Sequence, residues 1–586
     1  IPGYGVRVLP APRAPTPLPP PPPAPPSAPP MRRRRLWPRI AAGVAGVAGG
    51  AAAWHLWSAS RLTRSDHHTF ASAAYQYLTF KAMAALGRAA RTRLDDDCKD
   101  YEACQEALLR ELLEANKATA FGRDHGFEAL LKSDRLMEEF RRRMPLTRYD
   151  AYRSYIDQMQ SGEDPAALTS DTVDLFAVTS GTSGHRNVLP TTHRQRKVFF
   201  LNGIAPVFDC MFSAFPEAVQ LQRTCKVTYM PTYSTCEAGL RIGPNSSSPG
   251  DKSFQRLLPL YSTPKEAYAL KGNEAAALYI HALFALKDRQ LGIIEANFSS
   301  VVYTLFAQIE RSPVQLIRDV ETGRLSPSLA IPDAARRAIE ARMKPDPKRA
   351  EELRRAMFLG QGERVQVDTQ GLARRIWPNL NLLLTVNTGA FSLYGERLES
   401  SFTRGVPIYS PIYAATEGLV GVNVHEDKKN ENVAYTLVPK AMVFEFLPLC
   451  KSDEDPKHMS TKLAHELTIG EKYELVVTNL SGMCRYRFGD VVKFVGHHYH
   501  APKVEFCYRT GQLLNVRGEK TSETMMLDAL RRTFGTSNSS AQEPNRTQLR
   551  EYACAEYIHG GHVGNRSQID DVRSGATDPP HYVIFV

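Results

Sequence analysis

The order of hydrophobic and polar positions divides the chain into helical, mixed and strand-rich stretches. In residues 69–145, Leu108, Leu112 and Leu113 recur at helical spacing, which predicts helices. Residues 166–330 alternate short β-rich runs (LFAVTS, KVTYMPTYS) with longer helical ones (AAALYIHALFALKDRQLG), as layered α/β proteins do. Residues 331–375 are charged and periodic, which predicts a solvated helical hairpin.

Strand-rich patterns dominate the chain from residue 434 onward. The runs AYTLVPKAMVFEFLPL, YELVVTNLSG and RYRFGDVVKFVG predict antiparallel β structure. Residues 511–586 contain a helical run (TSETMMLDALRRTFG) and stop at HYVIFV, a strand that we expect to lack neighbours. The sequence therefore predicts an α/β fold. A large domain with layered sheets and helices spans 65–510, and a small, incomplete α+β domain spans 511–586.

The N-terminal part differs from this body. Fourteen of the forty prolines lie in residues 1–30, a composition that predicts a disordered tail. Within residues 31–64, an uncharged apolar run spans 40–57, with five arginines before it and two after it. This layout predicts a signal-anchor that spans a membrane. A cleaved targeting segment and a soluble Ala-rich helix are the alternatives.

The predicted anchor carries a prediction for location. The arginine cluster would stay in the cytosol and the body would enter the secretory pathway, for example the endoplasmic reticulum. Six N-x-S/T sequons, Asn479 among them, permit glycosylation there. A cytoplasmic location remains the alternative, and the oligomeric state is left open.

Charge and cysteine content exclude several classes of function. The net charge of +11 comes from the first 64 residues, which hold nine arginines and no acid, so the body carries only 64 − 62 = +2. Without a basic surface on the body, a nucleic-acid partner is not expected. The nine cysteines form no CxxC pair, which predicts free buried thiols, with a Cys98–Cys104 bridge as the alternative.

The clearest local motif is TSGTSG at residues 179–184, directly after the apolar run LFAV. Its two glycines allow a tight turn that points backbone N–H groups inward, and its hydroxyls can donate to phosphate oxygens. It is neither a Walker A loop nor a GxSxG nucleophile elbow. By composition alone, an ordinary turn is the alternative.

Three further motifs follow along the chain. In YAATEG (413–418), a hydroxyl stands beside a carboxylate, which suits a contact with Mg²⁺ and phosphate. In YRFGD (486–490), an aspartate follows a predicted β-turn and could accept hydrogen bonds from two ribose hydroxyls. Arg509 and the run VRGEK, which ends at Lys520, open the last segment.

Together and in this order, TSGTSG, YAATEG and YRFGD resemble the adenylate-forming superfamily. More narrowly, residues 103–586 resemble the auxin-responsive acyl-acid amido synthetase family, as an animal-type, membrane-anchored member whose C-terminal domain is truncated. The resemblance implies that ATP and a carboxylic acid give an acyl-adenylate, which an amine or amino acid then converts to an amide. It implies ATP and Mg²⁺ as cofactors and small-molecule acids and amines as substrates.

The resemblance also implies roles for individual residues. The phosphate loop would consist of Thr179, Ser180, Gly181, Thr182, Ser183 and Gly184. Thr416 would hold the AMP phosphate and Glu417 the Mg²⁺. Tyr413 would lie near the adenine, Asp490 would bind the ribose, and Gly389 would line the nucleotide or acyl pocket.

Arg509 would lie at the hinge to a mobile C-terminal lid, where Lys520 is the nearest candidate for a catalytic lysine. The sequence departs from the family pattern at Asn187, where relatives often carry lysine, and at Thr416, where they carry serine. A membrane-tethered pseudoenzyme is therefore an alternative. A thioester-forming acyl-CoA ligase is a third, disfavoured by the match over 103–170.

Overall fold

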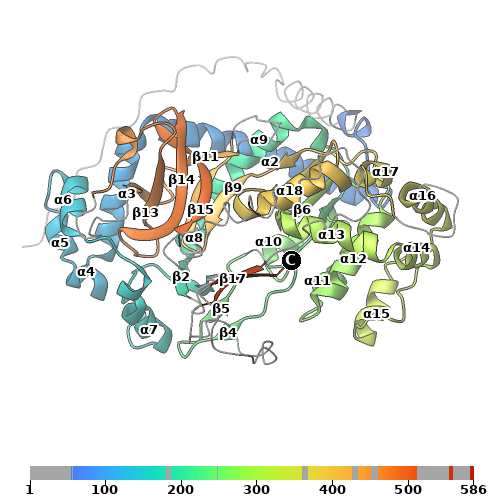
Figure 1. The fold of residues 1–586 in the computed structure, drawn as a ribbon, viewed down its shortest axis with the longest axis horizontal. Coiled ribbons are helices and arrows are strands. Elements are labelled where there is room, and N and C mark those ends of the chain that lie inside the picture. Colours follow the sequence, from blue (N-terminus) through green and yellow to red (C-terminus); the bar gives the residue numbers. More distant parts are fainter. Residues whose placement is uncertain are drawn as a thin grey trace, which may run out of the picture. The chain divides into compact units, whose positions relative to one another are not determined.

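The computed structural model describes residues 55, 57–179, 187–246, 248–358, 367–424, 433–449, 460–510 and 529, and the backbone of two strands at 553–557 and 581–585. Two compact units result, residues 1–61 and residues 62–586. All that follows concerns the second unit (Figure 1). Its mixture of helices and several sheets confirms the predicted α/β class.

Helices form the first part of this unit. Thr69 closes a capping box at the start of α2, because its side chain accepts a hydrogen bond from the amide of Ser72. The α2–α7 helices are α2 (Phe70–Lys99), α3 (Tyr101–Asn116), α4 (Ala120–Asp124), α5 (Phe127–Leu130), α6 (Leu136–Arg143) and α7 (Arg153–Ser161). Gln105 joins α3 to the neighbouring antiparallel sheet, donating to the carbonyls of Pro439 and Met442.

A parallel four-stranded sheet, in the order β3-β6-β7-β8, forms one hydrophobic core together with surrounding helices. Its strands are β3 (Thr224–Lys226), β6 (Ile293–Phe298), β7 (Leu382–Val386) and β8 (Ile408–Tyr409). Helix α12 (Glu274–Lys287) is apolar around most of its circumference and is buried along nearly its whole length. The other helices of this region are α10 (Lys252–Leu257), α11 (Lys265–Tyr268), α13 (Ser299–Arg311), α14 (Pro313–Thr322), α15 (Asp333–Glu340), α16 (Pro347–Met357), α17 (Leu372–Ile376) and α18 (Ser392–Arg397).

The hairpin predicted for residues 331–375 is only partly solvated. Helix α16 lies within this stretch, and it buries Leu353 and Met357 in the same core as α12. Its Arg349 is also buried, donating to the carbonyls of Leu286 and Ile376. The prediction of a solvated hairpin was therefore wrong for α16, because the pattern of charges hid a face that packs.

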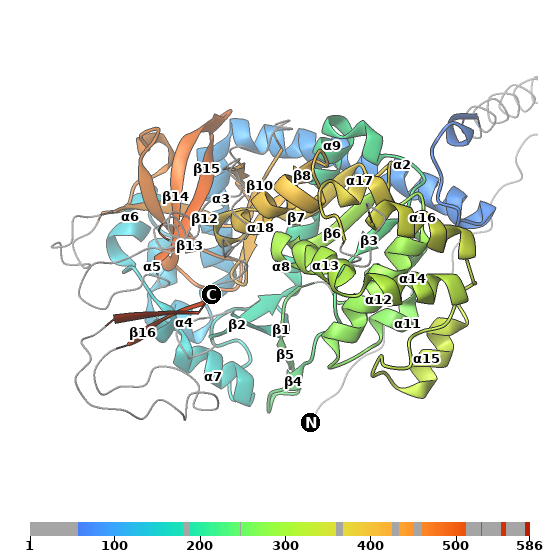
Figure 2. The same ribbon diagram turned by 45° about the vertical axis from the view of Figure 1, so that its right-hand side comes forward.

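The predicted antiparallel region is confirmed as a seven-stranded sheet in the order β12-β13-β14-β15-β11-β10-β9 (Figure 2). Its strands are β9 (Ile412–Ala415), β10 (Gly418–Val422), β11 (Ala434–Leu437), β12 (Val443–Pro448), β13 (Lys472–Thr478), β14 (Tyr486–His498) and β15 (Ala501–Arg509). Asp490, predicted to follow a β-turn, instead lies inside β14. Gly489, with φ +85°, lets the strand bend just before it.

Two smaller sheets complete the unit. The mixed sheet has the order β2-β1-β5-β4, and its strands are β1 (Val173–Val178), β2 (Val188–Thr192), β4 (Ser234–Thr235) and β5 (Arg241–Gly243). The strand HYVIFV was expected to lack neighbours, and this was wrong. As β17 (His581–Phe585), it pairs antiparallel with β16 (Ala553–Tyr557).

The predicted membrane segment lies almost wholly outside the described residues. Within residues 40–57, only His55 and Trp57 are described. Within the described part, one stretch, His193–Ala214, is long and apolar enough to cross a bilayer. It comprises α8 (His193–Val198), a π-helical turn (Phe199–Ile204) and α9 (Ala205–Ala214). Since α9 buries Cys210, Met211 and Ala214 beside α2, packing accounts for its apolar character.

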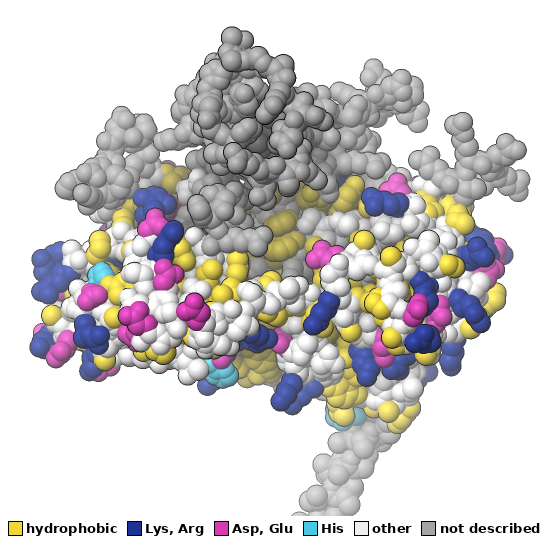
Figure 3. All heavy atoms as spheres, turned by 90° about the horizontal axis from the view of Figure 1, so that it is seen from below, with side chains coloured by type: hydrophobic (Ala, Val, Ile, Leu, Met, Phe, Trp, Pro, Cys, Tyr) yellow, Lys and Arg dark blue, Asp and Glu magenta, His cyan; other side chains and the backbone are white. Residues whose placement is uncertain are grey.

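The prediction of free thiols is confirmed for the seven described cysteines. The prediction that they are buried holds for four of them, Cys98, Cys210, Cys225 and Cys484, whereas Cys104, Cys236 and Cys507 are partly exposed. Acidic and basic side chains are intermixed on the face shown in Figure 3, as the small net charge of the body leads one to expect.

Candidate active site

Three of the predicted site residues meet at one point of the antiparallel sheet. Asp490 on β14 faces Arg509 on β15 in the strand register, and the Arg509 Nε donates to its Oδ1 at 2.6 Å. The Tyr413 hydroxyl on β9 donates to the other oxygen, Oδ2, at 2.7 Å. Asp490 is only 4% exposed. Its carboxylate still has lone pairs to accept further hydrogen bonds, as a ribose would require.

Thr416 and Glu417 form the two-residue turn between β9 and β10, where Ala415 pairs with Gly418. Two buried amide side chains fix this turn. The Gln195 Nε2 and the Asn479 Nδ2 each donate to the Glu417 carbonyl at 3.0 Å. Because both donors hold the backbone, they set the direction of the Glu417 side chain.

Glu417 is a buried carboxylate, 5% exposed. Burial raises its pKa from 4.5 to about 7, although the nearby Arg509 guanidinium acts in the opposite direction. Burial likewise raises the pKa of Asp490, again opposed by Arg509. Among the described residues, Arg509 therefore does not fully offset the cost of burying these two carboxylates. The buried Glu417 carboxylate follows Thr416, which carries a hydroxyl. This pair of oxygen-bearing side chains fits Mg²⁺, which prefers hard oxygen ligands.

Gly389 belongs to the same neighbourhood. It has φ +63°, and a Cβ at this position would lie 2.6 Å from a ring carbon of Phe506. Phe506 in turn packs edge-on against the Tyr413 ring, with centroids 5.7 Å apart. Glycine is therefore required here both by the backbone and by the close approach of the aromatic ring.

The phosphate-loop residues are only partly described. Thr179 follows β1, and its amide donates to the Asn187 carbonyl at 2.9 Å, which closes the base of the loop. Ser180, Gly181, Thr182, Ser183, Gly184 and the candidate Lys520 lie outside the described residues.

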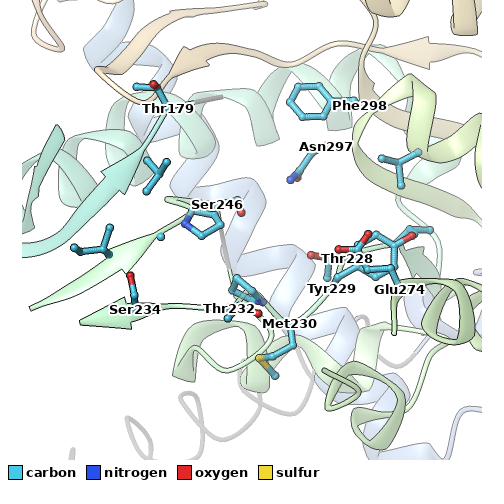
Figure 4. Close-up of a pocket in the computed structure, with 17 residues that line it drawn as sticks. Thr179, Thr228, Tyr229, Met230, Thr232, Ser234, Ser246, Glu274, Asn297 and Phe298 are labelled. Carbon is cyan, nitrogen blue, oxygen red and sulfur yellow. The ribbon is translucent and has the colours of Figure 1, made fainter. Parts of the chain in front are cut away.

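A cavity of about 880 Å³ opens beside Thr179 (Figure 4). It lies beyond the carboxyl ends of the parallel strands β3 and β6, where ligands bind in open α/β sheets. Its walls combine apolar and hydroxyl-bearing side chains, among them Thr179, Tyr229, Met230, Ser246, Phe298 and Val301. Glu274 is the one charged side chain among the described residues that line it.

One stacking contact ties the cavity to the rest of the site, and a buried histidine supports the cavity wall. The ring of Phe298 on the cavity wall stacks on Phe391, with centroids 4.3 Å apart, and Phe391 follows Gly389 in the same short turn. Behind the wall, the buried His281 bonds the Thr228 carbonyl through Nε2 and the Thr263 hydroxyl through Nδ1. Burial lowers the pKa of His281 to about 4, so the ring is neutral and serves to hold the wall.

Sequence reasoning missed Gln195, Asn479, Phe506 and the cavity wall. Thr192 and Gln195 do form a capping box at the start of α8, a visible signal of a helix start but not of a bond to residue 417. Asn479 was noted only as a glycosylation sequon. Its side chain is buried, with its oxygen accepting from Ser481 and Met483, so in the folded protein it is inaccessible to glycosylation.

Comparisons with known proteins identify the family of this chain. The family model described as the GH3 family N-terminal domain matches residues 90–408, and that of the GH3 family central domain matches residues 435–509. The indole-3-acetic acid-amido synthetase GH3.6 of Arabidopsis thaliana is 28% identical over 459 residues, covering 75% of this chain and 72% of that protein. The indole-3-acetic acid-amido synthetase GH3.8 of Oryza sativa subsp. indica is 28% identical over 484 residues, covering 80% and 76%.

Solved structures show the same fold. The GH3.15 acyl acid amido synthetase in complex with 2,4-DB superposes with a TM-score of 0.67 at 21% identity, covering 85% of this chain and 80% of that one. A second GH3.15 structure gives a TM-score of 0.64 at 23% identity, covering 76% and 75%.

Proposed function

Because the chain belongs to the GH3 family, we propose that it is an ATP-dependent acyl-acid amido synthetase. It activates a carboxylic acid as an acyl-adenylate and then transfers the acyl group to an amine, forming a C–N bond. Activation is required because a carboxylate is a poor electrophile, whereas AMP is a good leaving group. The observation that carries the proposal is the meeting of Tyr413, Asp490 and Arg509 beside the Thr416–Glu417 turn.

The nucleotide is proposed to bind over this cluster. Asp490 accepts hydrogen bonds from the ribose hydroxyls, and its bonds to Tyr413 and Arg509 hold the carboxylate in position. Tyr413 lies near the adenine, and Gly389, packed against Phe506, lines the nucleotide or acyl pocket. The hydroxyls and backbone amides of residues 179–184 surround the phosphates, and Thr416 donates to the phosphate that AMP retains.

Glu417 is proposed to hold Mg²⁺ against the phosphates. A bound cation would stabilise negative charge that develops on the transferring group. Without a cation, an ionised Glu417 would repel the nucleotide. The turn that presents Glu417 is fixed by Gln195 and Asn479, so these two side chains are positioning residues for the carboxylate.

The cavity beside Thr179 is proposed to receive the acyl group, since Thr179, the first residue of the predicted phosphate loop, is one of the residues that line it. Its size and its apolar and hydroxyl-bearing walls suit a bulky, largely neutral acid. Residues 511–586 would act as a lid, with Arg509 at its hinge and Lys520 as the candidate catalytic lysine. The relatives are named for indole-3-acetic acid.

We propose membrane attachment through residues 40–57, because this uncharged apolar run is preceded by five arginines. Two of the sequons that would support a luminal body fall at unsuitable places. Asn479 is buried, and Asn297 lines the cavity, where a glycan would block it. These two sequons therefore give no support to a luminal body, and a body that faces the cytosol is the alternative.

A screen of carboxylic acids for pyrophosphate release from Mg-ATP tests this function on the full chain. An active synthetase will release pyrophosphate only with its cognate acids, and addition of the right amine will yield an amide and AMP. A pseudoenzyme that keeps the fold as a binding module would bind ATP without release for any acid.

A further inference from the structure

The outward face of α2 is apolar where a surface helix is expected to be polar. Helix α2 packs beside α9 (Figure 2), and its buried residues include Ala73, Gln76, Tyr77 and Gly87. On the opposite side the helix exposes Phe70, Ala71, Tyr75, Leu78, Ala82, Ala85 and Ala89. Phe70 is 76% exposed and Leu78 is 65% exposed. At 1.5 Å per residue, the apolar face extends about 30 Å along residues 70–89.

Ordinary solvation does not account for this face. A helix at the surface of a globular unit usually carries charged and polar residues opposite its buried stripe. Single exposed apolar residues are common, but a continuous apolar stripe marks a surface that is covered by something else. On the same helix the pattern changes after Ala89, where the outward positions become Thr92, Arg93 and Asp96.

The charges on and near α2 indicate which kind of partner covers its apolar face. Residues 67–94 contain no aspartate or glutamate, whereas Lys81, Arg88, Arg91 and Arg93 lie within them. Arg91 is held by Asp95 at the far end of the stretch. Lys81 and Arg88 are exposed beside the apolar stripe. A helix with an apolar face bordered by cations is typical of segments that lie in the headgroup region of an anionic bilayer.

The position of α2 in the sequence also favours an anionic bilayer as the partner of this face. The apolar run of residues 40–57 ends only 70 − 57 = 13 residues before Phe70. We propose that the outward face of α2, residues 70–89, lies on the surface of a lipid bilayer containing anionic phospholipid. The contact would orient the catalytic unit against the membrane and keep it there even without residues 1–61.

Vesicle flotation tests the proposal with a protein that begins at Leu62, since residues 62–586 form a compact unit of their own. This protein should float with vesicles of phosphatidylcholine and phosphatidylserine, and less with phosphatidylcholine alone. Replacing both Phe70 and Leu78 with serine should lower the partition coefficient at least about tenfold, because two large apolar side chains leave the bilayer. Added salt should weaken binding by screening the cations.

Ile469→Ser is the matched control, because Ile469 is 69% exposed but lies far from α2 in the sequence, in the loop before β13. It should leave binding unchanged, and the thermal unfolding of all variants should match the parent. Equal flotation of the double-serine variant and its parent would overturn the proposal. So would loss of a dimer, rather than of vesicle binding, in that variant, because a second copy would then be the occupant.

The full chain provides an independent measurement. With the photo-crosslinking residue benzoylphenylalanine in place of Leu78, membranes holding the whole protein should yield lipid adducts on irradiation. The same residue in place of Ile469 should not. Crosslinks from position 78 only to protein would contradict a bilayer contact. Catalytic activity does not enter either readout, so failure here is distinguishable from failure of the proposed enzymatic function.

Discussion

Replacing Glu417 with glutamine should stabilise the ligand-free protein while nearly abolishing its activity. Burial raises the pKa of Glu417 from 4.5 to about 7. At about 1.4 kcal/mol per pH unit, holding the ionised carboxylate costs the folded protein about 3 kcal/mol relative to the unfolded chain. Glutamine has nearly the same shape and carries no charge, so it should recover up to that amount.

The gain in free energy of unfolding should increase with pH. A carboxyl group whose folded pKa is raised favours the folded state most when it is protonated, below pH 4.5. Its contribution is lost as the pH rises to 7. Urea unfolding of Glu417→Gln and the parent should therefore differ by up to about 3 kcal/mol at pH 8 and by little at pH 4.5. In contrast, acid-dependent pyrophosphate exchange should fall on the order of 100-fold, as expected when a metal contact is lost.

Glu445→Gln is the matched control, since Glu445 is equally buried but accepts hydrogen bonds from Arg485 Nε at 3.0 Å and from its second terminal nitrogen at 2.9 Å. Breaking this buried pair should destabilise the protein by about 3–5 kcal/mol. A Glu417→Gln protein that unfolds more easily than its parent at pH 8, or one that keeps full exchange activity, would refute the assignment of residue 417.

Three further substitutions follow from the same geometry. Asp490→Ala removes the acceptor for the ribose hydroxyls, at about 1.5–3 kcal/mol for each charge-assisted bond, so calorimetry should show weaker ATP binding with a smaller change in kcat. Gly389→Ala places a Cβ against Phe506 at φ +63°, and denaturation should show a loss of about 1–2 kcal/mol or more, with reduced ATP affinity. Phe298→Ala enlarges the cavity, so kcat/KM should shift toward bulkier acids while ATP affinity is retained. An unchanged acid preference would show that the acyl group does not bind in this cavity.

The sequence predicted the layers of the fold because hydrophobic periodicity reports burial. It indicated the helices near Leu108 and the antiparallel strands after residue 434, and both are present. It failed for α16, where many charges surround the buried Leu353 and Met357. It also placed Asp490 after a turn, because a local pattern does not reveal that Gly489 bends a continuous strand.

The candidate site was predictable only where a motif carries its own chemistry. Tyr413, Asp490 and Arg509 could be proposed from local runs, but their hydrogen bonds depend on the pairing of strands far apart in the chain. Asn479 could not be found in this way. Its amide reaches the Glu417 carbonyl across 62 positions of sequence, and no local pattern encodes that contact.

The central claim, that the protein joins acid to amine through an acyl-adenylate, is tested most directly by isotope transfer. A cognate acid labelled with oxygen-18 in its carboxylate, incubated with Mg-ATP and the amine, should transfer one labelled oxygen to the phosphate of AMP. Unlabelled pyrophosphate should form in an amount equal to that of AMP. Label recovered in inorganic phosphate together with ADP would indicate an acyl phosphate instead, and amide formation without label in AMP would contradict the account.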